Sequence, residues 1–101
     1  MAVFVKVCQT ADVKPGSGKS IELNDKAVAV FNVDGKFYAI NDTCKHRGGP
    51  LGQGELEGKT VVCPWHGWRY DVTTGANELV PEQPTEKYEV KVEGDDLFVA
   101  L

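Results

Sequence analysis

The N-terminal part of the chain consists of short apolar runs, some of which alternate with polar positions, and this pattern predicts β-strands rather than helices. Residues 3–8 are Val-rich and alternating, and residues 26–33 and 36–40 are further runs of strand length. The dipeptide Asp34-Gly35 separates the latter two runs and favours a type I′ turn, with positive φ at both central positions. These two runs are therefore predicted to form a tight β-hairpin.

A shorter strand is predicted ahead of this hairpin. Residues 11–19 contain one proline and two glycines, a composition typical of a loop. Residues 20–23 then alternate and end at a tight Asn24-Asp25 turn. The hairpin is thus expected to gain a third strand on its N-terminal side.

Extended segments recur in the C-terminal half, at residues 60–62, 69–72, 86–92 and 97–101. A turn at Thr74-Gly75 is expected after the second of these segments. Gly94, Asp95 and Asp96 separate the last two, which predicts a terminal hairpin.

Between these regions, residues 41–59 are rich in glycine and predict a long irregular segment, the kind of loop that usually carries function. We expect roughly residues 42–78 to form a small subdomain mounted on a β scaffold. Short strands at regular spacing, without a 3.6-residue periodicity, indicate an all-β fold with an antiparallel β-sandwich or barrel-like scaffold.

The composition fits one folded domain over residues 1–101, with 42% hydrophobic and 26% charged residues. Lys and Arg number 11 against 15 Asp and Glu, so the net charge is −4. This balance excludes nucleic acid and favours partners with basic docking surfaces. No apolar run reaches the roughly 20 residues of a membrane span, and no signal peptide is recognisable. We therefore expect a cytoplasmic protein without a membrane partner.

The chain has three cysteines, Cys8, Cys44 and Cys63. An odd number without a secretion signal argues against a disulfide framework. Cys8 falls in a predicted strand with no nearby histidine, so we expect it to be a small packed side chain. The chemistry is therefore expected at the other two.

Both histidines of the chain, His46 and His66, follow a cysteine closely. Residues 44–46 read Cys-Lys-His, and after sixteen residues 63–66 read Cys-Pro-Trp-His. Two thiolates and two imidazoles match a Rieske-type [2Fe-2S] centre, and they also suit a structural zinc site. Zinc fingers usually place a cysteine pair before a histidine pair, whereas here each loop carries one of each. A catalytic cysteine is a third alternative, but nothing in the sequence supplies an orienting third group.

The two boxes resemble the C-x-H and C-x-x-H motifs of the Rieske family. Other positions also look like family positions, namely Gly67, Asp71 and Gly75. The resemblance implies a Rieske-like β-sandwich whose inserted subdomain binds one [2Fe-2S] cluster. It further implies that Cys44 and Cys63 hold the inner iron, while His46 and His66 hold the outer iron near the surface.

The sequence also bears on the reduction potential, which for Rieske centres spans roughly −150 to +300 mV. Rieske proteins of cytochrome bc complexes carry a disulfide and a serine that bonds a cluster sulfur. Gly49, Trp65 and Trp68 stand at the corresponding places here. Tyr70 matches a position whose phenol can donate to a cysteine sulfur. We therefore expect a potential in the lower part of the range.

The resemblance implies a function as a ferredoxin, an electron carrier and not itself an enzyme. Single-domain Rieske ferredoxins of ring-hydroxylating oxygenase systems carry single electrons from a flavin-dependent reductase to a terminal oxygenase, and this chain is similar to them in size and in both boxes. We expect a monomer. The alternative is the small, Rieske-like subunit of an NAD(P)H-dependent nitrite reductase.

Overall fold

The computed structural model describes residues 3–23, 26–44, 49–65 and 67–100, and their regular structure is almost entirely strand. The strands are β1 (Phe4–Gln9), β2 (Ser17–Leu23), β3 (Lys26–Val33), β4 (Lys36–Asn41), β5 (Glu55–Glu57), β6 (Thr60–Val62), β7 (Arg69–Asp71), β8 (Lys87–Tyr88), β9 (Val90–Glu93) and β10 (Asp96–Ala100). Two single turns of 3₁₀-helix accompany them, η1 (Thr10–Asp12) and η2 (Leu51–Gln53). No helix in these ranges has the length and apolarity to cross a membrane.

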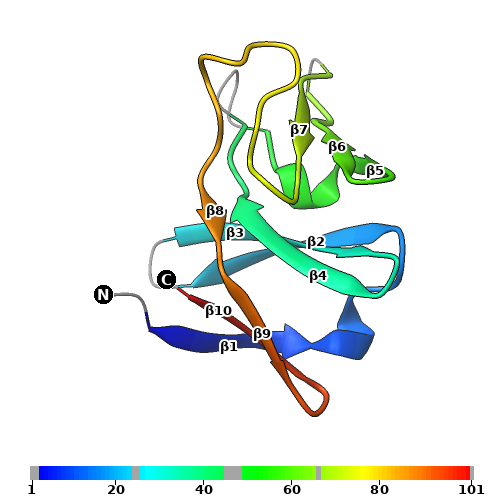
Figure 1. Ribbon diagram of the computed structural model, residues 1–101, viewed down its shortest axis with the longest axis vertical. Coiled ribbons are helices and arrows are strands. Elements are labelled where there is room, and N and C mark those ends of the chain that lie inside the picture. The colour runs from blue at the N-terminus through cyan, green and yellow to red at the C-terminus, as the bar shows by residue number, and fades with distance from the viewer. Residues whose placement is uncertain (1–2, 24–25, 45–48, 66, 101) are drawn as a thin grey trace.

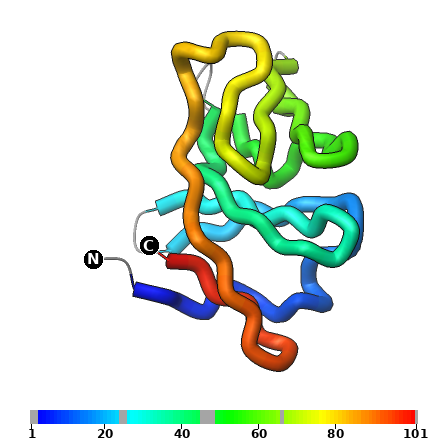
Figure 2. The backbone as a smooth tube through the Cα atoms, in the orientation of Figure 1, coloured from blue at the N-terminus to red at the C-terminus, as the bar shows by residue number. Residues whose placement is uncertain are grey.

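The strands pair in three antiparallel sheets, with orders β1-β10-β9, β2-β3-β4-β8 and β5-β6-β7. The four-stranded sheet lies in the middle of the molecule (Figure 1). The sheet that holds both ends of the described chain lies on one side of it, and β5–β7 with their loops lie on the other (Figure 2). The predicted all-β, antiparallel fold is confirmed.

The central strand β3 is buried on both faces, which explains its nearly unbroken run of apolar residues. Val28 and Val30 face the terminal sheet and pack with Leu97 and Val99. Successive side chains of a strand point to opposite faces, so the next residues along β3 enter a different core. That second core, towards β5–β7, contains Ala29, Phe31, Ile40, Cys44, Leu51, Val61, Cys63, Tyr70 and Val72.

The β3–β4 hairpin matches the prediction. Asp34 and Gly35 have φ values of 53° and 89°, the two positive angles that a type I′ turn needs. The Asn32 side chain accepts a hydrogen bond from the Gly35 N–H at 2.8 Å and donates one to the Val13 carbonyl at 2.9 Å. The turn is therefore fastened to the scaffold by a buried amide.

Two expectations about loops are wrong. Strand β2 begins at Ser17 rather than at residue 20, because Gly18 is a pairing position opposite Phe31. A Cβ at Gly18 would lie 2.5 Å from the Phe31 ring, so this glycine makes room for a core side chain. Strand β5 falls inside the predicted irregular segment and pairs with β6 around Gly58, whose φ is +63°. The predicted turn at residues 24–25 lies outside the described residues.

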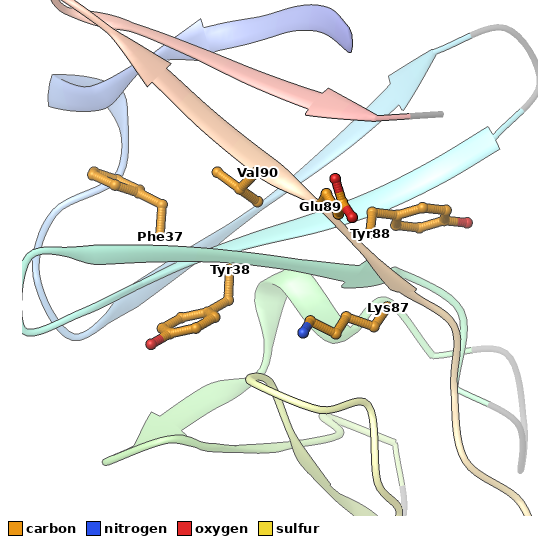
Figure 3. A pocket seen from close by; sticks show the side chains of 6 residues that line it. All are labelled: Phe37, Tyr38, Lys87, Tyr88, Glu89 and Val90. Atoms are coloured by element: carbon orange, nitrogen blue, oxygen red, sulfur yellow. The ribbon is translucent and has the colours of Figure 1, made fainter. Parts of the chain in front are cut away.

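The predicted C-terminal strand at 86–92 is two strands that belong to different sheets. β8 pairs with β4 at Ala39 and Ile40, whereas β9 pairs with β10. A pocket of about 290 Å³ opens where the chain crosses between the sheets (Figure 3). Its lining residues are Phe37, Tyr38, Lys87, Tyr88, Glu89 and Val90. The terminal hairpin turns at Gly94, and Asp96 already pairs with Glu93.

The close fit of Gly18 against Phe31 gives a test of this packing. Gly18→Ala is expected to lower the free energy of unfolding by about 1–3 kcal/mol, because the added methyl group overpacks a buried ring. Urea denaturation measures the change. Lys19→Ala, an exposed neighbour on the same strand, is the matched control and should stay within about 0.5 kcal/mol of the parent. Equal effects of the two substitutions would contradict the packing described.

Candidate metal centre

The two cysteines of the predicted boxes lie on separate loops that close in the same way. Cys44 follows β4, and its N–H donates to the Gly49 carbonyl at 2.9 Å. Cys63 follows β6, and its N–H donates to the Trp68 carbonyl at 2.7 Å. Each loop thus leaves and returns beside its own cysteine.

The structure brings Cys44 and Cys63 together inside the molecule. Both belong to the core between the four-stranded sheet and β5–β7, with exposed fractions of 1% and 2%, and their side chains are close enough to interact. A Cβ at Gly49 would lie 2.7 Å from the Cys63 sulfur and 3.1 Å from the Trp65 Cβ. The backbone of the first loop therefore lies directly against the sulfur of the second, a closeness that only glycine permits.

Tyr70, on β7, completes the buried surroundings of the thiols. Its hydroxyl oxygen lies 3.6 Å from the Cys44 sulfur, and its side chain is fully buried. Between a phenol and a thiol either group can donate, but a thiolate has no proton, so in the ligated state the phenol must be the donor. The predicted proximity of Tyr70 to a cysteine sulfur is confirmed.

The electrostatics around Cys63 disfavour a free thiolate. Burial raises the pKa of the Cys63 thiol, and the neighbouring Cys44 side chain raises this pKa further. Two adjacent thiolates in a dry interior repel each other and lack hydration, so a positive centre is needed to hold both deprotonated. Metal ions do this, since a coordinated thiol loses its proton outright. The chemistry of the two described donors therefore fits a metal or an iron–sulfur cluster.

The predicted histidine ligands, His46 and His66, lie outside the described residues. Within the described ranges, no group of three or more His, Cys, Asp or Glu side chains gathers in a way that could hold a metal ion. Of the four predicted ligands, the structure therefore places Cys44 and Cys63. The second loop reaches the surface within two residues of its cysteine: Cys63 is buried, whereas Trp65 is 50% exposed.

The connector after β7 folds back on that strand around Asn77, a residue that the sequence did not single out. Asn77 pairs with Tyr70 in an isolated bridge, and its side-chain oxygen accepts hydrogen bonds from the N–H groups of Leu79 and Val80. Its amide donates to the Gln83 carbonyl at 3.2 Å. Asn at the start of a proline-containing connector is a turn signal that could have revealed this arrangement.

The additional family-like positions have local structural reasons. Gly67 and Gly75 have φ values of +74° and +83°, which favour glycine. Burial alone would raise the pKa of Asp71, but hydrogen bonds from Thr73 and the charge of Lys59 outweigh it and hold this pKa below its usual value. The Asp71 carboxylate therefore stays charged and fixes the turn after β7.

The comparisons with known proteins agree on one family. Residues 3–99 match the family described as the Rieske [2Fe-2S] domain. The chain is 37% identical over 99 residues to the ferredoxin component of biphenyl 2,3-dioxygenase from Rhodococcus jostii (strain RHA1), covering 97% of this chain and 92% of that protein. It is 39% identical over 99 residues to the 3-phenylpropionate/cinnamic acid dioxygenase ferredoxin subunit from Escherichia coli (strain K12), covering 96% and 92%.

Solved structures give the same picture. The ferredoxin of carbazole 1,9a-dioxygenase from Nocardioides aromaticivorans IC177 superposes with a TM-score of 0.89 at 31% identity, covering 97% of each chain. A chain in a complex of reduced oxygenase and oxidized ferredoxin of carbazole 1,9a-dioxygenase gives 0.88 at 33% identity, covering 97% and 93%. A protein assigned as an NADH-dependent nitrite reductase small subunit from Mycobacterium tuberculosis gives 0.90 at 22% identity, covering 100% and 96%, which shows the fold alone.

The buried thiol pair, the two loops that carry it and the match over nearly the whole chain point the same way. The resemblance seen in the two boxes is confirmed. The chain belongs to the Rieske [2Fe-2S] domain family.

Proposed function

We propose that this chain is a Rieske ferredoxin that carries single electrons from a flavin-dependent reductase to a terminal oxygenase. The observation that carries the proposal is the buried pair Cys44 and Cys63, in a chain that aligns over most of the length of dioxygenase ferredoxin components. One ferredoxin of similar fold has been solved in a complex with its oxygenase, which supports the oxygenase as the acceptor. The reductase remains the part inferred from the family.

The proposed cofactor is one [2Fe-2S] cluster, with Cys44 and Cys63 on one iron and His46 and His66 on the other. When bound, the cluster supplies reversible uptake of a single electron. The chain's own residues prepare the place for it. Leu51, fully buried in the shared core, excludes water on the inner side, and the Tyr70 hydroxyl is placed to donate to the Cys44 sulfur.

We further propose that residues 1–101 act as a single Rieske domain in which roughly 42–78 is the cluster-binding subdomain. This segment contains the β5–β7 sheet and both cysteine loops, and its apolar side packs on β3 and β4 through the shared core. No catalytic role is assigned to the chain, since its relatives are named as components of dioxygenases. The cytoplasmic location and the monomeric state stay predictions.

The nitrite reductase alternative has weaker support. Proteins assigned as its small subunit share the fold at 20% and 22% identity, whereas the dioxygenase ferredoxins reach 37–39%. Reduction assays with each type of partner would separate the two systems directly.

The proposed ligands can be tested by single substitutions. Protein purified anaerobically is expected to hold two irons and two sulfides per chain, and Cys44→Ala or His66→Ala should abolish normal loading because each removes a ligand. Cys8→Ala is the matched control, because Cys8 is a free cysteine in β1 that packs against the other core. Iron and sulfide analysis with visible absorption measures the result. Unaltered spectra in the ligand variants, or a colourless zinc-loaded parent, would refute the proposal.

The contact between Tyr70 and Cys44 makes a separate prediction for the loaded protein. A hydrogen bond to sulfur stabilises the reduced, more negative state, so Tyr70→Phe should lower the reduction potential. The expected decrease is about 30–60 mV, up to a tenfold change in the one-electron equilibrium. Tyr38→Phe, a half-buried tyrosine against the same core, serves as the control. Redox titration gives the values, and an unchanged potential in Tyr70→Phe would contradict the donor role.

A further inference from the structure

Asp42 is a buried residue that joins three parts of the molecule by hydrogen bonds. Its N–H donates to the Ala27 carbonyl on β3 at 2.9 Å, and its own carbonyl accepts from the Leu51 N–H at 2.6 Å. Its side-chain oxygen Oδ1 accepts from the Ser20 hydroxyl on β2 at 2.8 Å and from the Gly52 N–H at 2.6 Å. One residue therefore holds β2, β3 and the returning end of the first cysteine loop.

The hydrogen bonds of Asp42 are the first in a short series of backbone pairs between residues 42–44 and residues 49–52, and the series ends at Cys44. Above Asp42, Thr43 and Pro50 form an isolated antiparallel bridge, and the Cys44 N–H donates to the Gly49 carbonyl. We call these two facing segments, residues 42–44 and 49–52, the neck of the loop. Cys44 lies only two positions after Asp42, the residue that anchors the neck. A displacement of Asp42 would therefore move the backbone that carries the Cys44 sulfur.

The neck is also pressed directly against strand β2. A Cβ at Gly52 would lie 2.6 Å from the Ser20 nitrogen and 2.7 Å from the Lys19 carbonyl carbon. A Cβ at Gly18 would lie 3.1 Å from the Gly52 carbonyl oxygen. Backbone thus meets backbone at this point, and the hydrogen bond from Ser20 to Asp42 fixes how the two surfaces are aligned.

We infer that Asp42 is a positioning residue for the cluster, which sets the place of the Cys44 sulfur relative to that of Cys63 by anchoring the neck to the central sheet. This inference rests on the proposed function. Asp42 is 7% exposed, so its removal leaves the Gly52 N–H and the Ser20 hydroxyl without this acceptor in a place where water replaces it poorly. Removal of the Asp42 side chain is therefore expected to loosen the Cys44 sulfur, which has to bind the same iron as the Cys63 sulfur of the other loop.

The test compares two substitutions at the same position. Asp42→Ala is expected to release the cluster about tenfold faster than the parent in the presence of an iron chelator, at the lower end of the effects seen for residues that support metal ligands. Asp42→Asn keeps a side-chain oxygen that can accept both hydrogen bonds, so it should restore the parent rate and the parent EPR spectrum. Absorbance decay and EPR of the reduced protein are the two readouts.

Asn32→Ala is the matched control. Asn32 is 5% exposed and its side chain also makes two hydrogen bonds, but to Val13 and Gly35 in the scaffold rather than to the neck. It should lower the unfolding midpoint while leaving cluster release and EPR unchanged. If Asp42→Ala does not fold, Ser20→Ala decides the question, with a smaller but measurable acceleration expected.

The outcomes separate the two levels of the proposal. A parent protein with a normal [2Fe-2S] spectrum, and equal release rates in Asp42→Ala and Asn32→Ala, would overturn the positioning role alone. Failure of Asp42→Asn to restore the rate, or a parent-like rate in Ser20→Ala when the alanine variant does not fold, would do the same. A parent without any [2Fe-2S] spectrum would overturn the proposed function and this inference with it.

Discussion

The whole arrangement depends on a central sheet that is buried on both faces. Strand β3 sends Val28 and Val30 into one core and Ala29 and Phe31 into the other. The first core joins the sheet to the terminal strands and makes a stable scaffold. The second core joins it to β5–β7 and ends at the two cysteines. The position of the thiols is thus determined by the same strand that stabilises the fold.

Two thiols buried side by side limit the chemistry that suits the site. A dry interior disfavours thiolates, and the raised pKa of Cys63 expresses that cost. The arrangement becomes favourable when a positive centre binds both sulfurs, and the surrounding groups are suited to that state. Tyr70 can donate to a sulfur, and Gly49 lets the loops approach without a side chain between them. The two loops, each closed by its own hydrogen bond, then act as the two sides of a clamp.

Much of the scaffold could be predicted from local pattern. The bounds of β3 follow from an apolar run of strand length, and the turn at Asp34-Gly35 follows from turn chemistry; both act over a few residues. The failures occur where glycine serves packing. Gly18 suggested a loop but lies in β2 against Phe31, and the density of glycines around β5 concealed a short strand. The split of the last predicted strand into β8 and β9 depends on which sheet each half joins, a tertiary choice.

The site divides in a similar way. The two boxes predicted which residues carry the chemistry, and the structure brings Cys44 and Cys63 together. Tyr70 was predicted to lie beside a cysteine sulfur, but the anchoring role of Asp42 was not, because its partner on β2 is 22 residues distant in sequence and is recognisable only once the neck rests on the sheet. The histidine ligands stay a prediction of the motif.

The ligand set of the cluster is the central claim, and pulsed EPR of the dithionite-reduced protein tests it most directly. Hyperfine couplings from two nitrogen ligands are expected in the parent protein, one from His46 and one from His66, and replacing either histidine should remove one of them. A reduced cluster without strongly coupled nitrogens, or a protein that contains zinc and gives no signal, would contradict the assignment.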